Sequence, residues 1–202
     1  MVLGDNIFFG HGLPELLAAA DARRTGGTVF GYRVADPERY GVVGFDAAGR
    51  ATTIIEKPAV PPSNYAVTGL YFLDGRAPER AARVRPSARG EVEITALLEM
   101  YLDEGSLDVQ RMGRGFAWLD TGTHESLLDA GNFVRTLQRR QGMQTGSPEE
   151  IAFMRGWIGP EALRAQAQRM AKNSYGQYLL GLLDEPAPAA AKAHQDRAQD
   201  RA

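Results

Sequence analysis

The sequence predicts an α/β protein built on an incomplete doubly wound mixed sheet, with helices at its C-terminal end. Apolar, strand-like segments alternate with amphipathic helical segments up to about residue 140. Between residues 148 and 183 only helical patterns occur. Acidic side chains also follow apolar segments near both ends of this region, and ligands of open α/β sheets bind beyond the carboxyl ends of strands.

The first half of the chain is predicted to be mainly strands. Val2–Asn6 has the pattern of a strand end, and 13–24 that of a helix with Pro14 in its first turn. A strand over 28–34 follows, rich in β-branched and aromatic residues. A hairpin of strands 41–45 and 51–56 and a long strand over 65–73 complete this half.

The second half is predicted to be mainly helical. We expect helices over 76–84 and 94–104, a strand over 107–112, and a buried segment ending at Trp118-Leu119. A helix over 125–137 would be capped by Thr121 or Thr123, and two or three helices would lie between 148 and 183. The expected organisation is an α/β domain over 1–140, a helical appendage of it over 141–184, and a disordered tail over 185–202.

Composition narrows the function. The chain has 202 residues, is 44% hydrophobic and carries a formal net charge of -2, so neither a nucleic-acid polymer nor an anionic membrane is expected as partner. It has no cysteine, which excludes disulfides, zinc–thiolate sites and thiol nucleophiles. There is no signal-peptide pattern and no apolar stretch near the roughly 20 residues needed to span a bilayer. A cytoplasmic protein is predicted.

Asp5 and Asp120 are candidate metal ligands. Each is predicted to lie just after an apolar, strand-like segment, at the rim where ligands bind. Carboxylates without a neighbouring histidine or cysteine suit a hard cation such as Mg2+, which fills its other positions with water and phosphate oxygens. The alternative is that they only cap helices or form turns.

Three further segments could contact a substrate. Glu56-Lys57 ends a predicted strand, where a carboxylate can accept hydrogen bonds from sugar hydroxyls and an ammonium group can bind phosphate. Tyr40-Gly41 could let a ligand approach the main chain, and Arg89 could bind phosphate. Each has a plain alternative as a solvated strand end, a turn or an exposed arginine. His11 and His124 lie in no catalytic pattern and are interpreted as structural.

Several of these segments occur together in the order found in one enzyme family. They are Leu3-Gly4-Asp5-Asn6-Ile7-Phe8, Asp36-Pro37-Glu38-Arg39-Tyr40-Gly41-Val42-Val43, Glu56-Lys57-Pro58, Ser63–Tyr71, Pro86–Glu91, Trp118–His124, Pro148–Phe153 and Asn173–Leu179. Over about residues 2–183 the chain resembles bacterial glucose-1-phosphate thymidylyltransferase. This enzyme joins glucose 1-phosphate to dTTP, giving dTDP-glucose and pyrophosphate, a step of dTDP-rhamnose biosynthesis.

The resemblance implies a role for each candidate. Asp5 and Asp120 would hold Mg2+, the cofactor. Glu56 and the main chain of Gly41 and Val67 would hold the glucose, with Tyr40 beside them. Lys57 and Arg89 would hold the sugar phosphate. No side chain of this segment is expected to act as nucleophile or general base, because the phosphate is already ionised.

The resemblance also implies a second, regulatory nucleotide-sugar pocket, involving Gly10, His11, Arg114, Glu150 and Ile151. An ordinary interface is the alternative. The family is usually tetrameric, so a homo-oligomer is expected.

The chain departs from the family at its front. The glycine-rich Gly-x-Gly-Thr-Arg-Leu loop that cradles the nucleotide phosphates is not in the sequence. We therefore expect about a hundred family residues to be missing before Met1, as a start codon assigned inside a longer reading frame would produce. We expect little or no dTDP-glucose synthesis by the 202-residue chain alone.

Two alternatives to a transferase remain. One is a non-catalytic fragment that keeps the sugar-phosphate or oligomer contacts. The other is a metal-dependent glycosyltransferase, which would be expected to carry a paired-aspartate motif in place of the single Asp5.

Overall fold

The computed structural model describes residues 1–184 and separates into two compact units. The first is Met1–Ala130 and the second begins at Gly131. The predicted domain limit after residue 140 stays a prediction, and the predicted tail over 185–202 lies outside the described residues. The two units are described separately.

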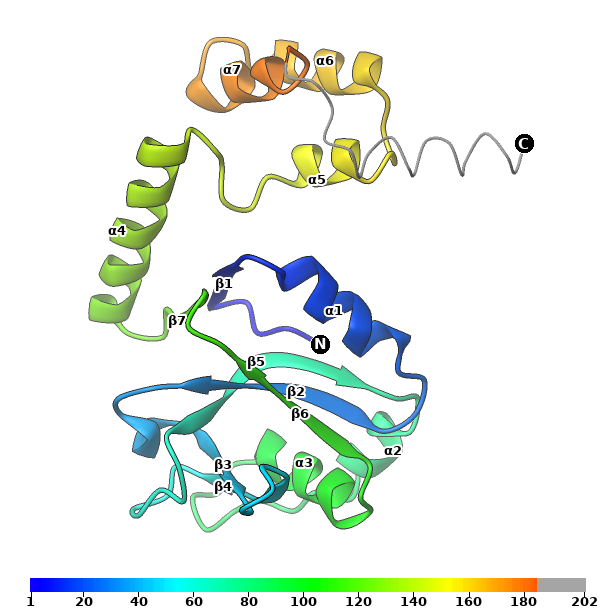
Figure 1. Ribbon diagram of the computed structural model, residues 1–202, viewed down its shortest axis with the longest axis vertical. Coiled ribbons are helices and arrows are strands. Elements are labelled where there is room, and N and C mark those ends of the chain that lie inside the picture. Colours follow the sequence, from blue (N-terminus) through cyan, green and yellow to red (C-terminus); the bar gives the residue numbers. More distant parts are fainter. Residues whose placement is uncertain (185–202) are drawn as a thin grey trace. The chain divides into compact units, whose positions relative to one another are not determined.

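The first unit is organised around two β-sheets (Figure 1). A two-stranded antiparallel sheet pairs β1 (Asn6–Gly10) with β7 (Phe116–Asp120). In the five-stranded sheet, β2 and β6 run parallel and the other neighbours antiparallel. Its strands, in spatial order, are β4 (Ala51–Glu56), β3 (Gly41–Phe45), β5 (Tyr65–Leu73), β2 (Gly27–Arg33) and β6 (Leu107–Met112).

Helices cover both faces of the larger sheet (Figure 1). Successive side chains of a strand point to opposite faces, and β2 shows this directly. Val29 packs into a cluster with Leu98 of α3 (Ile94–Asp103), whereas Phe30 packs into a cluster with Ala20 of α1 (Leu13–Ala22). Both side chains are fully buried. The predicted α/β class with a mixed sheet is therefore confirmed.

Most predicted strands are confirmed, and the first is corrected. The hairpin, β5 and β6 have the predicted bounds. The prediction that Val2–Asn6 ends a strand was wrong, because Val2 forms only an isolated bridge to Leu70 and the strand starts at Asn6. The apolar residues of β1 pair with the distant β7, a partner that local pattern does not reveal.

Helix limits also differ from the predicted ones. Helix α1 ends at Ala22, α2 is only Ala77–Ala81, and α4 extends over His124–Gln141. The turn before β3 is a 3-10 helix, Pro37–Arg39.

A buried ionic cluster joins α2 to the end of α3. Arg80 is only 2% exposed and forms ion pairs with Asp74, at 3.4 Å, and with Glu104. Its guanidinium carbon lies 4.2 Å from the centre of the Tyr101 ring, and the Tyr101 hydroxyl donates to Asp74 at 2.9 Å. The buried charge is thus paired and stacked, as an interior arginine requires.

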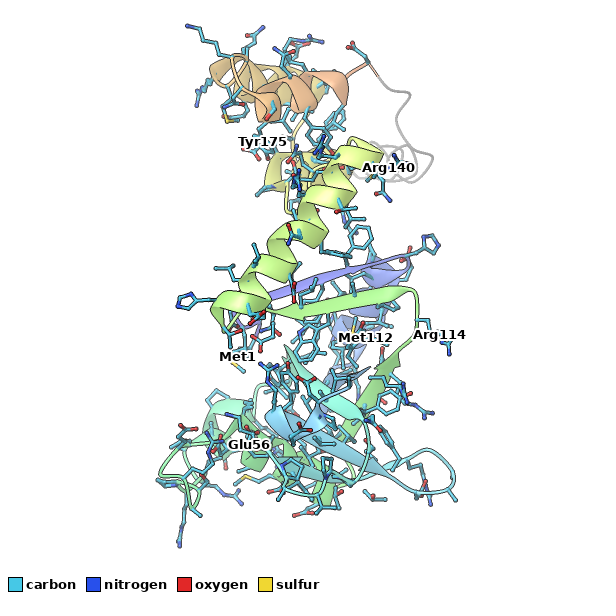
Figure 2. The ribbon with its side chains drawn as sticks, turned by 90° about the vertical axis from the view of Figure 1, so that its left-hand side faces the viewer. Met1, Glu56, Met112, Arg114, Arg140 and Tyr175 are labelled. Atoms are coloured by element: carbon cyan, nitrogen blue, oxygen red, sulfur yellow. The ribbon has the colours of Figure 1, made fainter. Side chains whose placement is uncertain are left out.

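The second unit contains three helices after the end of α4, in agreement with the predicted two or three. A small core of Leu163, Ala167 and Leu179 joins the last two helices. The hydroxyl of Tyr175, labelled in Figure 2, donates to Glu149 at 2.5 Å. No helix of residues 1–184 is long and apolar enough to cross a membrane. The three helices are α5 (Pro148–Met154), α6 (Pro160–Arg169) and α7 (Ser174–Gly181).

Candidate functional site

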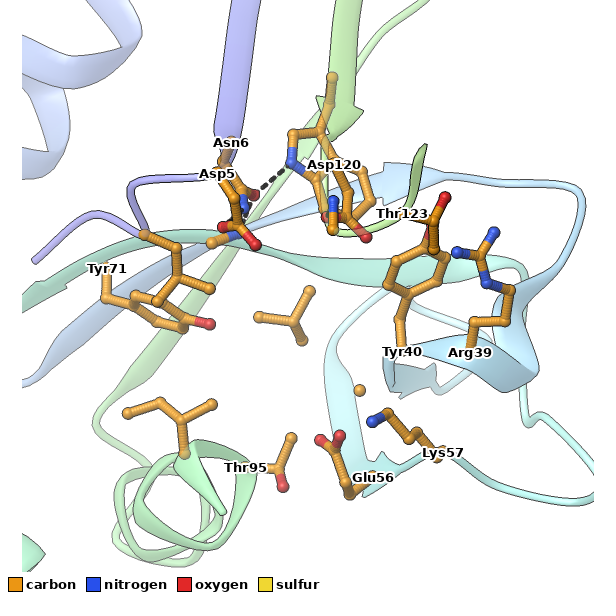
Figure 3. A pocket seen from close by; sticks show the side chains of 17 residues that line it. Asp5, Asn6, Arg39, Tyr40, Glu56, Lys57, Tyr71, Thr95, Asp120 and Thr123 are labelled. Carbon is orange, nitrogen blue, oxygen red and sulfur yellow. Dashed lines mark hydrogen bonds between the residues drawn. The ribbon is translucent and has the colours of Figure 1, made fainter. Parts of the chain in front are cut away.

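One pocket of about 550 Å3 in the first unit collects nearly all the predicted site residues (Figure 3). Its walls come from the start of β1, the end of β7, the open end of the β3–β4 hairpin and the first turn of α3. All of the predicted metal and substrate residues line it except Arg89. The lining residues from that set are Asp5, Tyr40, Gly41, Glu56, Lys57, Val67 and Asp120.

Asp5 and Asp120 meet because β1 and β7 are antiparallel. Asn6 lies opposite Asp120 in the register, so the residue that precedes β1 is next to the residue that ends β7. The main-chain carbonyl of Asp5 also accepts hydrogen bonds from the N–H and hydroxyl of Thr121, at 2.8 and 2.9 Å. The expectation that both aspartates follow strands was therefore wrong for Asp5, although the predicted meeting of the two residues in one pocket is found.

Asp120 does not cap the helix that follows it. Thr123 does so, because its hydroxyl accepts the N–H of Ser126 while the Ser126 hydroxyl accepts the N–H of Thr123, each at 3.1 Å. Asp120 instead accepts the N–H of Gly122 with Oδ1, at 2.9 Å. Of the two predicted caps, Thr123 is correct and Thr121 is not. The second carboxylate oxygen of Asp120 has no hydrogen bond among the described residues, so it can act as a ligand.

The chemistry of this pair fits Mg2+. Two carboxylates face one pocket, and Mg2+ takes one or two carboxylates with water and phosphate oxygens for the rest. Among residues 1–184 no cluster of three or more His, Asp or Glu side chains is arranged to hold a metal. Two carboxylates can supply only part of the ligands of such an ion, and water or phosphate oxygens can supply the others.

Lys57 faces the aspartates from the far side of the pocket, beside Glu56 (Figure 3). Its φ of 42° is the only positive value of a non-glycine residue in the part of the chain that the structure describes. Its N–H donates to the carbonyl of Tyr40 at 2.9 Å, and Pro58 follows it. A left-handed lysine is strained by about 1 kcal/mol or more. Such strain is typical of functional positions, and this backbone conformation is found in a lysine whose side chain lines the pocket.

The pocket environment raises the pKa of Glu56. Burial raises the pKa of its carboxyl, and the negative charge of Glu93 raises it further. Burial similarly raises the pKa of the Tyr71 hydroxyl to about 12 and that of Tyr40 above its ordinary value. Both hydroxyls can donate hydrogen bonds to a ligand, as tyrosine hydroxyls do below their pKa.

Arg89 lies beside the pocket wall, where carboxylates surround it. Its guanidinium is 3.8 Å from Glu56, 3.6 Å from Glu93 and 2.9 Å from Glu91. The side chain is 41% exposed, so these pairs are weak and exchangeable. Arg89 could turn to a phosphate in the pocket by exchanging some of these partners.

Sequence reasoning missed several pocket residues. Arg39, Asn6, Gly69, Tyr71 and Trp118 stand inside the motifs quoted above, but nothing in the pattern distinguished them. Thr95 carried no signal at all, since it lies in the first turn of α3, far along the chain from Gly41. A Cβ added at Gly41 would lie 2.6 Å from the Thr95 methyl carbon and 3.2 Å from a Glu56 oxygen. That close approach is why this position is a glycine.

The residues of the predicted regulatory pocket fall into both units. Gly10 ends β1, where a Cβ would lie 2.3 Å from the Phe116 ring, so packing alone accounts for this glycine. His11 and Arg114 are exposed, and Arg114 lies away from Glu56 in the first unit (Figure 2). Glu150 and Ile151 belong to α5 of the second unit. This pocket stays a prediction.

The fold and this pocket define a class of protein. The sequence pattern of the nucleotidyl transferase family matches residues 1–136, so the chain belongs to the nucleotidyl transferase family. The predicted resemblance is also confirmed at finer detail. The chain is 59% identical over 182 residues to glucose-1-phosphate thymidylyltransferase of Xanthomonas campestris pv. campestris (strain B100). It is 56% identical over 183 residues to that of Neisseria meningitidis serogroup A.

These matches cover most of this chain but only part of each relative. They span 90% and 91% of the chain, and 62% and 64% of the two relatives. The chain thus spans less than two thirds of their length.

Solved structures support the same fold. A Bacillus anthracis structure assigned to glucose-1-phosphate thymidylyltransferase, in complex with a sucrose, matches with a TM-score of 0.57 and 39% identity. That match covers 66% of this chain and 53% of the other. A UDP-glucose pyrophosphorylase complexed with UDP-glucose matches with a TM-score of 0.58 over 67% of this chain and 55% of the other. At 22% identity it shows the fold alone, in agreement with the predicted α/β class.

Proposed function

We propose that the chain carries the sugar-phosphate and metal side of a glucose-1-phosphate thymidylyltransferase. The overall reaction joins glucose 1-phosphate to dTTP and yields dTDP-glucose and pyrophosphate. The observation that carries this proposal is the single pocket in which an aspartate pair faces Glu56 and Lys57. Its support beyond geometry is the high identity to enzymes of that name.

The pocket residues divide into sugar-facing and phosphate-facing groups. Glu56 would accept hydrogen bonds from glucose hydroxyls, and the main chain of Gly41 and Val67 would contact the sugar, beside Tyr40. Lys57 would pair with the phosphate. Arg89 would join it after exchanging its carboxylate partners for phosphate oxygens.

In this reaction the role of the protein is to position the two substrates and to neutralise the charge of their phosphates. A phosphate oxygen of glucose 1-phosphate forms the new bond to the α-phosphorus of dTTP, and the bond from that phosphorus to the β-phosphate oxygen breaks. Pyrophosphate leaves with the electron pair of the broken bond. No base is needed, because the attacking oxygen is already ionised.

Asp5 and Asp120 would hold Mg2+, which supplies neutralising charge to the phosphates when bound. The protein's own cations act on the same charge: Lys57 would hold the sugar phosphate close to the aspartate side. The hydroxyls of Tyr71 and Tyr40, whose pKa values burial raises further above neutrality, would act there as hydrogen-bond donors.

Other properties belong to the same proposal. We place the protein in the cytoplasm, in dTDP-rhamnose biosynthesis, as a homo-oligomer that is tetrameric as in the family. The second candidate is a fragment that binds sugar phosphate without turnover. It is favoured by the absence of the glycine-rich phosphate loop from the 202 residues.

A calorimetric titration of the chain with glucose 1-phosphate and Mg2+ tests the proposal. Binding that is lost with glucose 6-phosphate as the ligand supports the site, and no binding of glucose 1-phosphate overturns it. A parallel assay of dTDP-glucose formation separates the two candidates. Turnover establishes the complete enzyme, and binding without turnover establishes the fragment.

A further inference from the structure

The side chain of Asn6 is fixed at both ends of its amide (Figure 3). Its Oδ1 accepts hydrogen bonds from the N–H of Gly69, at 3.0 Å, and from the indole N–H of Trp118, at 2.6 Å. Its Nδ2 donates to Oδ1 of Asp5 at 2.8 Å. One amide therefore connects the start of β1 to β5, to β7 and to a carboxylate of the pocket.

These partners allow only one orientation of the amide. Gly69 N–H and the Trp118 indole can only donate, so they require the amide oxygen. An ionised Asp5 carboxylate can only accept, so it requires the amide nitrogen. A flip would oppose like groups at all three contacts. The hydrogen bonds from Gly69 and Trp118 to Oδ1 therefore orient Nδ2 toward Asp5.

The neighbouring strand makes room for this arrangement. A Cβ added at Gly69 would lie 2.6 Å from Oδ1 of Asn6, a separation that side chains do not adopt. A glycine at this position lets the amide approach the main chain of β5 closely enough to bond to it.

The arrangement leaves one Asp5 oxygen for a ligand. Oδ1 is occupied by Asn6, and Oδ2 accepts no hydrogen bond from the described residues. Partners that hold a metal-binding carboxylate in this way commonly change metal affinity by about 10- to 100-fold.

We propose that Asn6 is a positioning residue, which fixes the Asp5 carboxylate in the pocket so that its free oxygen can bind the divalent cation. This inference rests on the proposed metal-dependent function. A residue that only joined strands would need the Oδ1 contacts alone, whereas a positioning residue acts through its nitrogen on Asp5.

The first measurement tests the link without metal. The side-chain amide of Asn6 is observed by NMR in the 202-residue chain and in the Asp5→Ala variant. We expect its resonances to move far more than those of Asn64, whose exposed amide donates to Val34. Unchanged Asn6 resonances would overturn the inference.

The second measurement is a double-mutant cycle on cation affinity. Mn2+ serves as the probe, because oxygen ligands suit it as they suit Mg2+, and bound Mn2+ is followed by water-proton relaxation. Asn6→Ala should weaken Mn2+ binding about tenfold in the natural chain and less than twofold in an Asp5→Asn background. Asn64→Ala, the matched control, should leave the affinity unchanged.

Each outcome decides one of the two claims. Equal losses from Asn6→Ala in both backgrounds would show that Asn6 does not act through Asp5. If the natural chain binds no Mn2+, the metal proposal fails, and the amide resonances alone decide whether Asn6 fixes Asp5. If the Asn6→Ala chain does not fold, the Asn6 amide resonances of the natural chain and of Asp5→Ala again decide whether Asn6 fixes Asp5.

Discussion

The main-chain carbonyl of Asp5 accepts two hydrogen bonds from Thr121, one from its N–H at 2.8 Å and one from its hydroxyl at 2.9 Å. Thr121 directly follows Asp120, and both aspartates line the same pocket. The aspartates are therefore brought together by the fold itself, before any ligand arrives.

Loss of either carboxylate should remove divalent-cation binding. We expect Asp5→Asn and Asp120→Asn each to weaken Mn2+ binding at least about tenfold, because a hard cation loses one of two charged ligands. Relaxation titrations measure the affinity. Asp108→Asn is the matched control, since Asp108 is a partly exposed strand aspartate outside the pocket. Equal affinity in all three variants would exclude the aspartate pair as the metal site.

Two substitutions of Lys57 separate the effect of its strained backbone from the effect of its charge. Lys57→Gly removes the ammonium group and relieves the left-handed backbone, whereas Lys57→Ala removes the ammonium group and keeps the strain. We expect Lys57→Ala to be less stable than Lys57→Gly by about 1 kcal/mol, measured by denaturant unfolding. Both should bind glucose 1-phosphate about tenfold more weakly, because a phosphate loses a charged partner. Unchanged affinity in both variants would remove Lys57 from the site.

A methyl group at position 41 should damage the pocket. In Gly41→Ala the new Cβ meets the Thr95 methyl carbon at 2.6 Å. Relief of that contact must move the buried Thr95 side chain, β3 or α3, at a cost of about 1–3 kcal/mol, and should weaken glucose 1-phosphate binding. Gly75→Ala is the control, since no heavy atom lies within 4 Å of its added Cβ. Calorimetry measures the affinity for glucose 1-phosphate, and thermal unfolding measures the stability. Equal affinity and stability of Gly41→Ala and Gly75→Ala would contradict the prediction.

The protonation of Glu56 should appear in the pH dependence of stability. Its pKa is raised in the folded chain above the ordinary 4.5 by burial first and by Glu93 second, and Lys57 and Arg89 only partly oppose this. The folded state then holds a proton that the unfolded state releases, so its contribution to stability is fully present below about pH 4.5 and is lost as pH rises through the raised pKa.

The experiment compares the natural chain with Glu56→Gln. The natural chain should lose stability relative to the variant as pH rises from 4 to 7, measured as the difference in urea midpoint. The difference isolates Glu56 from carboxyls with lowered pKa, such as Asp74 and Glu104, which change stability in the opposite direction. A constant difference across this range would show that the Glu56 pKa is not raised.

Local pattern was sufficient for part of the fold. The β3–β4 hairpin and β5 have the bounds expected from alternating apolar residues and turn glycines, since both signals are local. Strand β1 could not be placed, because its only partner in the sheet is more than a hundred residues away. The limits of α2 and α4 also depend on packing rather than on the local pattern.

The site was predictable where a motif named its residues. Asp5, Glu56, Lys57 and Asp120 lie in the motifs that carry the family resemblance, and Glu56 and Asp120 also end strands. Thr95 and the orientation of Asn6 were not accessible, since each depends on which elements pack together. The predicted role of Arg89 at the sugar phosphate stays a prediction, and its three carboxylate neighbours are a property of the folded loop that the sequence pattern does not reveal.

The pairing of β1 with β7 also determines when Asp5 and Asp120 come together during synthesis and folding. The bond between Trp118 and Asn6 joins residues 112 positions apart, and contacts at such separation form late because a long loop must first close. A chain emerging from the ribosome could complete the β3–β4 hairpin early, yet it would have no aspartate pair until β7 was synthesised. Competence to bind the cation would thus mark the completion of the first unit.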